Sequence, residues 1–221
     1  MLKIITTSDG SHSLLNEEIN ETYHSVHGAI QESAHVFIKN GLEHELQKRP
    51  SLPLRIFELG FGTGLNALLT WNHSVQHQTK IHYTSIEASP LADEIWSQLN
   101  YGAHVGMDNE FQALHRATWG VLHRVTPDFG LEKVCSTLQQ FEFPQVPFDL
   151  IYYDAFAPSK QPELWTLNML EKAFTGLKPG GTFVTYCAKG QFKRDLGTLG
   201  FTVETLAGPP GKKEMVRASK P

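Results

Sequence analysis

The sequence predicts an α/β fold in which helices flank a mostly parallel sheet. Two observations indicate it: from residue 54 onward short apolar runs alternate with helix-like segments, and a glycine-rich stretch at residues 60–64 separates the first run from its helix. The 221 residues suffice for one such domain with an elaboration. A composition of 40% hydrophobic and 19% charged residues excludes disordered, collagenous and coiled-coil chains.

The expected elements follow from apolar runs, helical periodicity and turn signals, taken in chain order. The strands are expected at residues 54–59, 81–86, 134–138, 148–153, 182–187, 201–206 and 214–218. The helices are expected at residues 65–73, 91–99, 111–117, 163–177 and 192–199. Turns are expected at residues 127–130, 178–181 and 208–211, and the last of these joins the two terminal strands into a pair that closes the sheet.

Residues 1–50 lack the alternation of strand-like and helix-like segments that begins at residue 54. They contain too few large apolar residues to form a core alone, so we expect an N-terminal elaboration packed on a domain of residues 51–221. Within it, residues 34–38 fit a strand or a short helix. The first six residues turn polar too quickly for a signal peptide, and no run of eighteen apolar residues occurs, so we expect a cytoplasmic protein.

The net charge of −4 is unevenly distributed. Residues 156–221 hold ten lysines and arginines against five aspartates and glutamates, whereas the preceding residues are acidic. A basic surface on an acidic body fits a protein that binds a polyanion. A solvated helix face followed by a basic tail explains the same distribution, so charge alone leaves both interpretations open.

Cysteine and histidine give no sign of a metal centre. Cys135 and Cys187 are too few for a disulfide framework and are expected to be buried thiols. Two histidine pairs have ligand spacing, but no acidic or cysteine cluster accompanies either, so no metal is expected. These pairs are His24 with His27 and His73 with His77.

The glycine-rich stretch is the strongest local signal for a ligand. Gly60, Gly62 and Gly64 allow a tight turn and a close approach of the backbone, and the following helix supplies free N–H groups. The dinucleotide fingerprint requires a glycine where Leu65 stands. The spacing instead suits S-adenosylmethionine, whose amino group Glu58 could meet.

Two carboxylates stand at the ends of expected strands. Glu87 ends the second strand, where an acidic side chain can accept both ribose hydroxyls of a nucleotide-type ligand. Asp154 directly follows the strand at residues 148–153 and precedes a stiff loop with two prolines. Since ligands bind beyond the carboxyl ends of the strands, both residues are expected in the site.

At this point the sequence resembles the MnmC-type tRNA 5-methylaminomethyl-2-thiouridine methyltransferases. The stretches that carry the resemblance are GFGTGLN at residues 60–66, DAFAP at 154–158, PELWT at 162–166 and GKKEM at 211–215. The segment from Tyr23 through Glu32, with Val36 and Phe37, also resembles the family's entry segment. The resemblance covers nearly the whole chain from about Thr22. It implies a class I S-adenosylmethionine-dependent methyltransferase fold, which is Rossmann-like with a mostly parallel seven-stranded sheet. It also implies S-adenosyl-L-methionine as cofactor and the wobble uridine of tRNA as target.

The resemblance also implies roles for individual residues. Asp154 and Phe156 would be catalytic: Asp154 would accept a hydrogen bond from the amine N–H, and Phe156 would pack against the nucleobase. Ser25, Lys160, Lys212 and Lys213 would face the substrate, the lysines as candidate phosphate contacts. The cofactor would be held by Glu58, Gly60, Phe61, Gly62, Thr63, Gly64, Asn66, Glu87, Ser136 and Thr137. Ser136 and Thr137 stand where the family often has a Gly-Asp pair that reads the adenine.

The bifunctional members of that family carry a second, FAD-dependent oxidoreductase domain that exposes the aminomethyl group. The 221 residues leave no room for it, so we expect a stand-alone methyltransferase. A separate FAD-dependent oxidoreductase or another enzyme would supply the aminomethyl precursor.

The expected reaction is N-methylation of 5-aminomethyl-(2-thio)uridine to 5-methylaminomethyl-(2-thio)uridine, in which Asp154 acts as a base or only orients the amine. A spermidine-synthase-like aminopropyltransferase or another small-amine methyltransferase would share the fold and the acidic strand ends. A non-catalytic RNA-binding protein with this fold is a third alternative. The DAFAP context and the basic C-terminal third favour the tRNA substrate, and the retained acidic residues and glycines argue against a non-catalytic protein.

Overall fold

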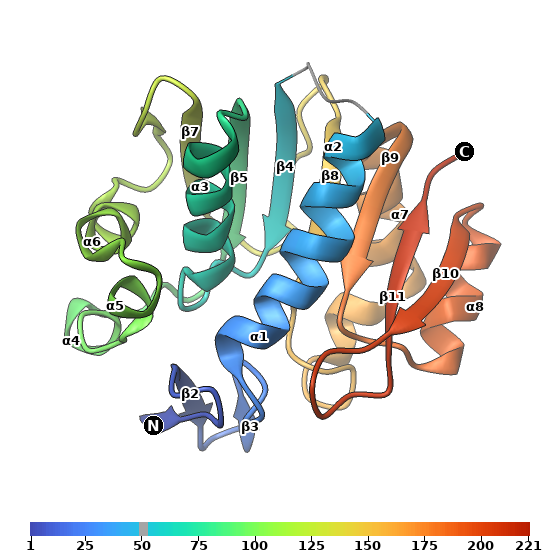
Figure 1. Cartoon of the computed structure of the whole chain (residues 1–221). Coiled ribbons are helices and arrows are strands. Elements are labelled where there is room, and N and C mark those ends of the chain that lie inside the picture. The colour runs from blue at the N-terminus through green and yellow to red at the C-terminus, as the bar shows by residue number, and fades with distance from the viewer. Residues whose placement is uncertain (49–52) are drawn as a thin grey trace.

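The computed structural model describes residues 1–48 and 53–221 (Figure 1). Within them, eight strands form the main sheet in the order β10-β11-β9-β8-β4-β5-β7-β6. Its strands are β4 (Leu54–Leu59), β5 (Ile81–Glu87), β6 (Leu122–Arg124), β7 (Phe129–Cys135), β8 (Phe148–Tyr153), β9 (Leu177–Thr185), β10 (Thr202–Ala207) and β11 (Glu214–Ser219). The five central strands β9, β8, β4, β5 and β7 are parallel, whereas β6 and β11 run antiparallel to their neighbours. The expected mostly parallel α/β fold is confirmed.

Helices cover both faces of this sheet. The helical elements are α1 (Ala29–Ser33), the π-helical η1 (Ala34–Glu43), α2 (His44–Lys48), α3 (Leu65–His77), α4 (Asp93–Trp96), α5 (Tyr101–Val105), α6 (Asp108–Arg116), the 3₁₀ turn η2 (Pro162–Trp165), α7 (Leu167–Gly176) and α8 (Gly190–Thr198). Figure 1 shows α1, α2 and α3 on one face and α7 and α8 on the other. In β4, Ile56 belongs to the core under η1 and α3, and its neighbour Phe57 to the core under α7 and α8. Alternate side chains along β4 therefore belong to two separate cores, one on each face of the sheet.

The N-terminal residues form a small sheet of their own. β1 (Leu2–Thr6), β2 (His12–Asn16) and β3 (Glu21–Thr22) pair antiparallel. Asp9 closes the first hairpin and fixes it to α1, because its carboxylate accepts the N–H groups of Ser11 and Gln31, each at 3.0 Å. Figure 1 shows the small sheet beyond the carboxyl ends of the central strands. The expected boundary between residues 50 and 51 lies outside the described residues.

Several expectations about the elements are wrong in detail. Among the described residues the main sheet has eight strands instead of seven. The additional strand, β6, pairs with β7 at the edge of the sheet, and its three residues are too few to give a recognisable pattern. The strand expected at 134–138 begins at Phe129, within the expected turn. The start of this strand was missed because Lys133 looks like a solvent-exposed residue in the sequence. In the structure it is buried, and its ammonium lies 5.0 Å and 4.6 Å from the ring centroids of Phe61 and Trp119. Residues 34–38 are helical, and β1–β3 were not anticipated.

Cys135 is exposed, so the expectation that both thiols are buried is wrong for it. It is the last residue of β7, where the strand emerges from its helical cover. Cys187 is buried as expected, and both thiols are free. In the described ranges no helix is both long enough and apolar enough to cross a bilayer.

Gly41 lets the N-terminal helix approach the sheet closely. A Cβ atom at this position would lie 3.0 Å from Val184 Cγ2 and 3.2 Å from Tyr152 Cε1, tighter than most real contacts. Since η1 precedes α2 and follows α1 without a break, this contact fixes the whole helical segment across the sheet. The small sheet is thereby held in place at the carboxyl end of the strands.

We predict that Gly41→Leu lowers the free energy of unfolding by roughly 1–3 kcal/mol, because the larger side chain overpacks the contact with β8 and β9. Urea denaturation followed by circular dichroism measures the change. Gly197→Leu is the matched control, since Gly197 is exposed in α8 and nothing lies within 4 Å of its Cβ position. Equal effects of the two substitutions would contradict the close approach.

Candidate active site

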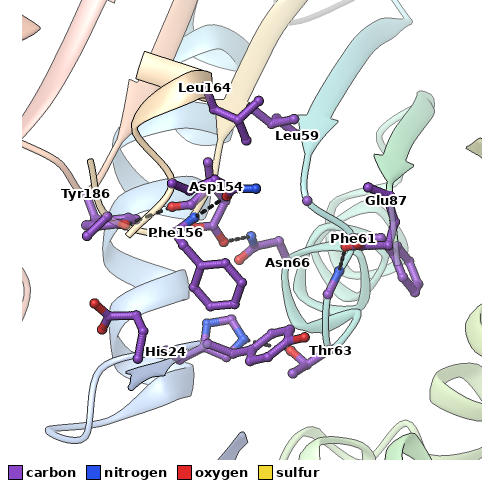
Figure 2. A pocket seen from close by; sticks show the side chains of 18 of the residues that line it. His24, Leu59, Phe61, Thr63, Asn66, Glu87, Asp154, Phe156, Leu164 and Tyr186 are labelled. Atoms are coloured by element: carbon purple, nitrogen blue, oxygen red, sulfur yellow. Dashed lines mark hydrogen bonds between the residues drawn. The ribbon is translucent and has the colours of Figure 1, made fainter. Parts of the chain in front are cut away.

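A cavity of about 660 Å³ lies at the carboxyl ends of the central strands. Its volume is within the range of ligand pockets. The walls come from the small sheet, the loop after β4 and the ends of β5, β7, β8 and β9. Figure 2 shows the labelled side chains around it, with Tyr186 and Glu87 on opposite sides of Asp154 and Asn66. The cavity therefore has two ends, joined at Asp154.

The glycine loop forms one wall of this cavity through close backbone contacts. Gly60 has φ +91°, and a Cβ atom there would lie 2.7 Å from the carbonyl oxygen of Asp154. Only glycine allows the ends of β4 and β8 to approach this closely. The loop is also fixed to β5, because the N–H groups of Gly60 and Phe61 both donate to the carbonyl of Ile86 at 3.0 and 3.1 Å.

Glu87 lies beside the glycine loop at the end of β5. Its carboxylate accepts the N–H groups of Gly62 at 3.0 Å and Ser89 at 2.8 Å. Burial raises the pKa of Glu87, and these two N–H groups oppose the rise. Ser136 and Thr137 line the same end of the cavity after β7. This end thus presents a fixed acceptor and two hydroxyl groups.

Two neutral histidines hold Thr63 in the loop. The Nε2 atom of His24 lies 2.7 Å from Thr63 Oγ1, and that of His115 lies 3.1 Å from the carbonyl of Thr63. Burial lowers the pKa of His24 to about 4 and of His115 to about 3, so both rings are uncharged at neutral pH. The segment between β3 and α1 and the helix α6 therefore both fix the glycine loop.

Asp154 is held at the junction of the two ends. Its Oδ2 atom accepts a hydrogen bond from Asn66 Nδ2 at 2.8 Å, and its backbone N–H donates to Leu59 at 3.1 Å. Desolvation, and then the negative charge of Glu32, raises the pKa of Asp154 to about 7. Its carboxyl group can therefore exchange a proton near neutral pH.

Phe156 forms an aromatic wall next to Asp154. Its ring packs edge-on against Tyr23 with centroids 5.0 Å apart. Trp165 Nε1 donates to the carbonyl of Phe156 at 2.8 Å, and Gln161 accepts the N–H of Phe156 at 3.3 Å. These contacts fix the stiff loop after β8, so the ring is preorganised to pack against a planar ligand.

The other end of the cavity is built from residues far apart in the chain. Lys212 forms an ion pair with Glu32 at 2.5 Å, and its ammonium lies 3.8 Å from the ring centroid of Tyr186. The hydroxyl of Tyr186 donates to the carbonyl of Ala155 at 2.8 Å, next to Asp154. A charged pair and an aromatic ring therefore face the side of Asp154 away from Glu87.

Most of the residues expected in the site line this cavity. They are Ser25, Gly60, Phe61, Gly62, Thr63, Asn66, Glu87, Ser136, Thr137, Asp154, Phe156 and Lys212. Gly64 does not line it; it caps α3 with φ +74°, and a Cβ atom there would meet His115 at 2.9 Å. Lys160 and Lys213 also lie outside the cavity lining, so any contact with a substrate would be at its outer surface.

Glu58 lies behind the cavity wall, contrary to the expected contact with a cofactor amino group. It is fully buried, and its Oε2 atom accepts the hydroxyl of Ser85 at 2.6 Å. Strand alternation is the reason: Glu58 points to the same face of β4 as Ile56, under α3. Desolvation raises its pKa to about 8, so the carboxyl group is mainly protonated at neutral pH.

Several residues that line the cavity were not expected to have an individual role in the site, among them Tyr23, His24, Glu32 and Tyr186. Tyr186 directly follows β9, so the rule that identified Asp154 after β8 could have found it. Glu32 lies in the N-terminal segment that resembles the family, but its ion pair with Lys212 could not be foreseen, because the two residues are 180 positions apart. In the described part of the chain, no three histidine, cysteine or acidic side chains are grouped as a metal site.

Comparisons with known proteins agree with this fold. A family model described as S-adenosyl-L-methionine-dependent methyltransferase matches residues 121–221. The protein named tRNA 5-methylaminomethyl-2-thiouridine biosynthesis bifunctional protein MnmC from Cupriavidus necator is 33% identical over 90% of this chain and 32% of its own length. Its namesake from Pseudoalteromonas atlantica is 32% identical over 95% of this chain and 32% of its own length.

A solved structure described as MNMC2 from Aquifex aeolicus matches with a TM-score of 0.80 and 25% identity, covering 100% of this chain and 72% of that one. The fold is therefore that of a Rossmann-like class I methyltransferase. The chain spans about one third of the length of the curated relatives it matches.

We predict that Glu58→Gln becomes increasingly stabilising, relative to the unaltered protein, between about pH 4.5 and pH 8. In this window the unfolded chain releases the Glu58 proton whereas the folded protein retains it, so the native glutamate lowers stability as pH rises. The gain should reach roughly 3–5 kcal/mol, because each unit by which folding raises the pKa of Glu58 costs about 1.4 kcal/mol of stability above that window. Urea denaturation at a series of pH values measures it. Glu171→Gln, at an exposed position in α7, is the control, and parallel pH curves for all three proteins would contradict the assignment.

Proposed function

Because the chain is an MnmC-like methyltransferase domain in sequence and fold, we propose that it methylates the primary amine of 5-aminomethyl-(2-thio)uridine at the wobble position of tRNA. The observation that supports this best is the position of Asp154. Its carboxyl group, with a pKa near 7, stands between a glycine-loop end suited to a nucleotide-type cofactor and an aromatic end suited to a base.

S-adenosyl-L-methionine fits the glycine-loop end. Residues 60–63 line this end of the cavity, so a ligand bound there would contact the loop directly. Glu87 is the acceptor that would hold the ribose hydroxyls, and Ser136 and Thr137 would lie near the adenine. When bound, this cofactor supplies an electrophilic methyl group. Glu58 would support the loop from behind, without a direct contact.

Asp154 and Asn66 would prepare the amine for methylation. An alkyl amine is largely protonated at neutral pH and must lose a proton before its lone pair can react. A carboxylate with a pKa near 7 can accept that proton, and its second oxygen can orient one of the two remaining N–H groups. The hydrogen bond from Asn66 fixes the direction of the carboxylate, and Phe156 would hold the base against it. Asp154 thus acts as base and orienting residue together.

The proposed tRNA substrate accounts for the basic C-terminal third. Lys160 and Lys213 lie outside the cavity lining, where they could contact phosphates of the anticodon arm. We propose that residues 1–50 serve as an elaboration that completes the site, and residues 51–221 as the methyltransferase domain. A tRNA substrate makes the cytoplasm the expected compartment, and a separate FAD-dependent oxidoreductase or another enzyme would supply the aminomethyl group.

The test is transfer of labelled methyl from S-adenosylmethionine to tRNA that carries the unmethylated aminomethyl group, followed by nucleoside analysis. Formation of 5-methylaminomethyl-(2-thio)uridine only in the presence of the protein supports the proposal. Cofactor binding by calorimetry without transfer to tRNA would contradict the tRNA substrate and direct the search to small amines. Turnover of putrescine with decarboxylated cofactor would instead indicate an aminopropyltransferase.

We predict that Asp154→Asn lowers the rate of methyl transfer by about 10²–10⁴-fold, the usual contribution of a general base. An asparagine carbonyl can still accept the hydrogen bond from Asn66, so cofactor affinity measured by calorimetry should stay within about threefold, a small change in binding free energy. In the unaltered protein kcat/KM should fall as pH falls through about 7, because Asp154 becomes protonated. Asp128→Asn, at the opposite edge of the sheet, is the control. A variant that loses cofactor binding but keeps its turnover would contradict this role.

A further inference from the structure

The ion pair of Lys212 and Glu32 lies within the cavity instead of on the protein surface. The side chain of Glu32 is 7% exposed and that of Lys212 is 32% exposed, and both residues line the cavity. A surface lysine that only contacts phosphates would not need a buried carboxylate as its partner. The pair therefore calls for a role inside the site.

Several contacts hold the pair in one place. Glu32 Oε2 accepts the backbone N–H of Ser25 at 2.7 Å, and the aromatic ring of Tyr186 lies beneath the ammonium of Lys212. A Cβ atom on Gly211 would lie 1.9 Å from His27, so the turn before β11 is pressed against the N-terminal segment. His35 Nε2 lies 2.8 Å from the carbonyl of Ala207 at the other end of that turn. The positive and negative groups are thus preorganised side by side.

The pair lies at the substrate end of the cavity. Tyr186, which contacts Lys212, is on the side of Asp154 opposite Glu87 (Figure 2). Both charges act on Asp154: Glu32 raises its pKa and Lys212 lowers it. A ligand whose amine meets Asp154 would therefore place the neighbouring atoms of its ring near these two groups.

Resting on the proposed function, we propose that Lys212 and Glu32 read the Watson–Crick edge of the target base and select uracil over cytosine. In a 5-substituted uracil the O4 acceptor is adjacent to the substituent and the N3–H donor comes next. The Lys212 ammonium donates to O4, and the Glu32 carboxylate accepts from N3–H. Cytosine presents the reverse pattern, an amino donor followed by an N3 acceptor, so it meets a like group at both positions.

The two side chains can read the base without separating. An ammonium has three N–H donors, and a carboxylate has about four acceptor positions. The contacts with Ser25 and within the pair leave both groups able to bond a ligand. Phe156 and Tyr23 would pack against the ring, as aromatic side chains do for unstacked bases. Aromatic contact thus supplies affinity, and the charged pair supplies selectivity.

The experiment compares kcat/KM on two synthetic anticodon stem-loops that differ in the wobble nucleoside, 5-aminomethyluridine or 5-aminomethylcytidine. The unaltered protein should prefer the uridine by roughly 10- to 100-fold, the discrimination of one good two-point base contact. Lys212→Met and Glu32→Gln should each reduce this preference to less than about threefold, mainly by slowing the uridine reaction, as loss of one partner of that contact implies.

Lys213→Met is the matched comparison, because it removes a positive charge from the neighbouring position outside the cavity lining. As a phosphate contact it should weaken both RNAs alike and leave the preference unchanged. Equal behaviour of the two lysine variants would overturn the proposal and make Lys212 a phosphate contact. Thermal melting shows whether each variant is folded. If Lys212→Met is not folded, the uridine preference of Glu32→Gln tests the proposal.

The outcomes also separate this proposal from the one on which it rests. If the unaltered protein methylates both RNAs equally well, base reading by the pair is refuted whereas the tRNA methyltransferase function stands. If it methylates neither RNA although it binds S-adenosylmethionine, both proposals fail together.

Discussion

The parallel pairing of β4 with β5 and β8 is the constraint on which the rest of the structure depends. It brings the glycine loop, Glu87 and Asp154 to the same edge of the sheet, although they lie up to 94 residues apart in the chain. The contact of Gly60 with the backbone of Asp154 is possible only in this register. A shift of one residue would turn Asp154 to the opposite face and replace the glycine at the contact. The glycine loop and the carboxylate of Asp154 are therefore positioned by the same set of strand pairings.

Desolvation gives the acidic residues at this edge different protonation behaviour. Glu58, buried under α3, holds its proton up to about pH 8, whereas Asp154 releases it near pH 7. Each negative charge would make the other more costly, so the neutral state of Glu58 allows Asp154 to ionise. Glu58 thus acts on Asp154 through its charge state, although it does not line the cavity.

The features that depend on local pattern could be predicted from the sequence. The alternation of strands and helices, the glycine loop, Glu87 and Asp154 all follow from short runs of residues and from the rule for carboxyl ends of parallel strands. The expectation that Glu58 lies in the cavity wall did not hold. Its position next to the loop in the sequence does not say to which face of β4 its side chain points. β7 was misplaced because a buried lysine, stabilised by two aromatic rings, reads as a surface residue. β1–β3 carry too little apolar periodicity to be recognised.

Ser25 and Lys212 were expected at the substrate end, but the ion pair of Lys212 with Glu32 could not be predicted, because its partners are 180 residues apart in the chain. Glu32 lies in α1 and Lys212 in the turn before β11. They are in contact because β11 pairs with β9 and η1 packs across the same sheet. Close packing at Gly41 and Gly211 makes this meeting rigid, since neither position has space for a side chain. A methyltransferase sheet alone would provide the cofactor loop and Asp154. The N-terminal segment adds Tyr23 and Glu32 to the cavity, so the second end, where we propose that the base is read, depends on contacts between segments far apart in the chain.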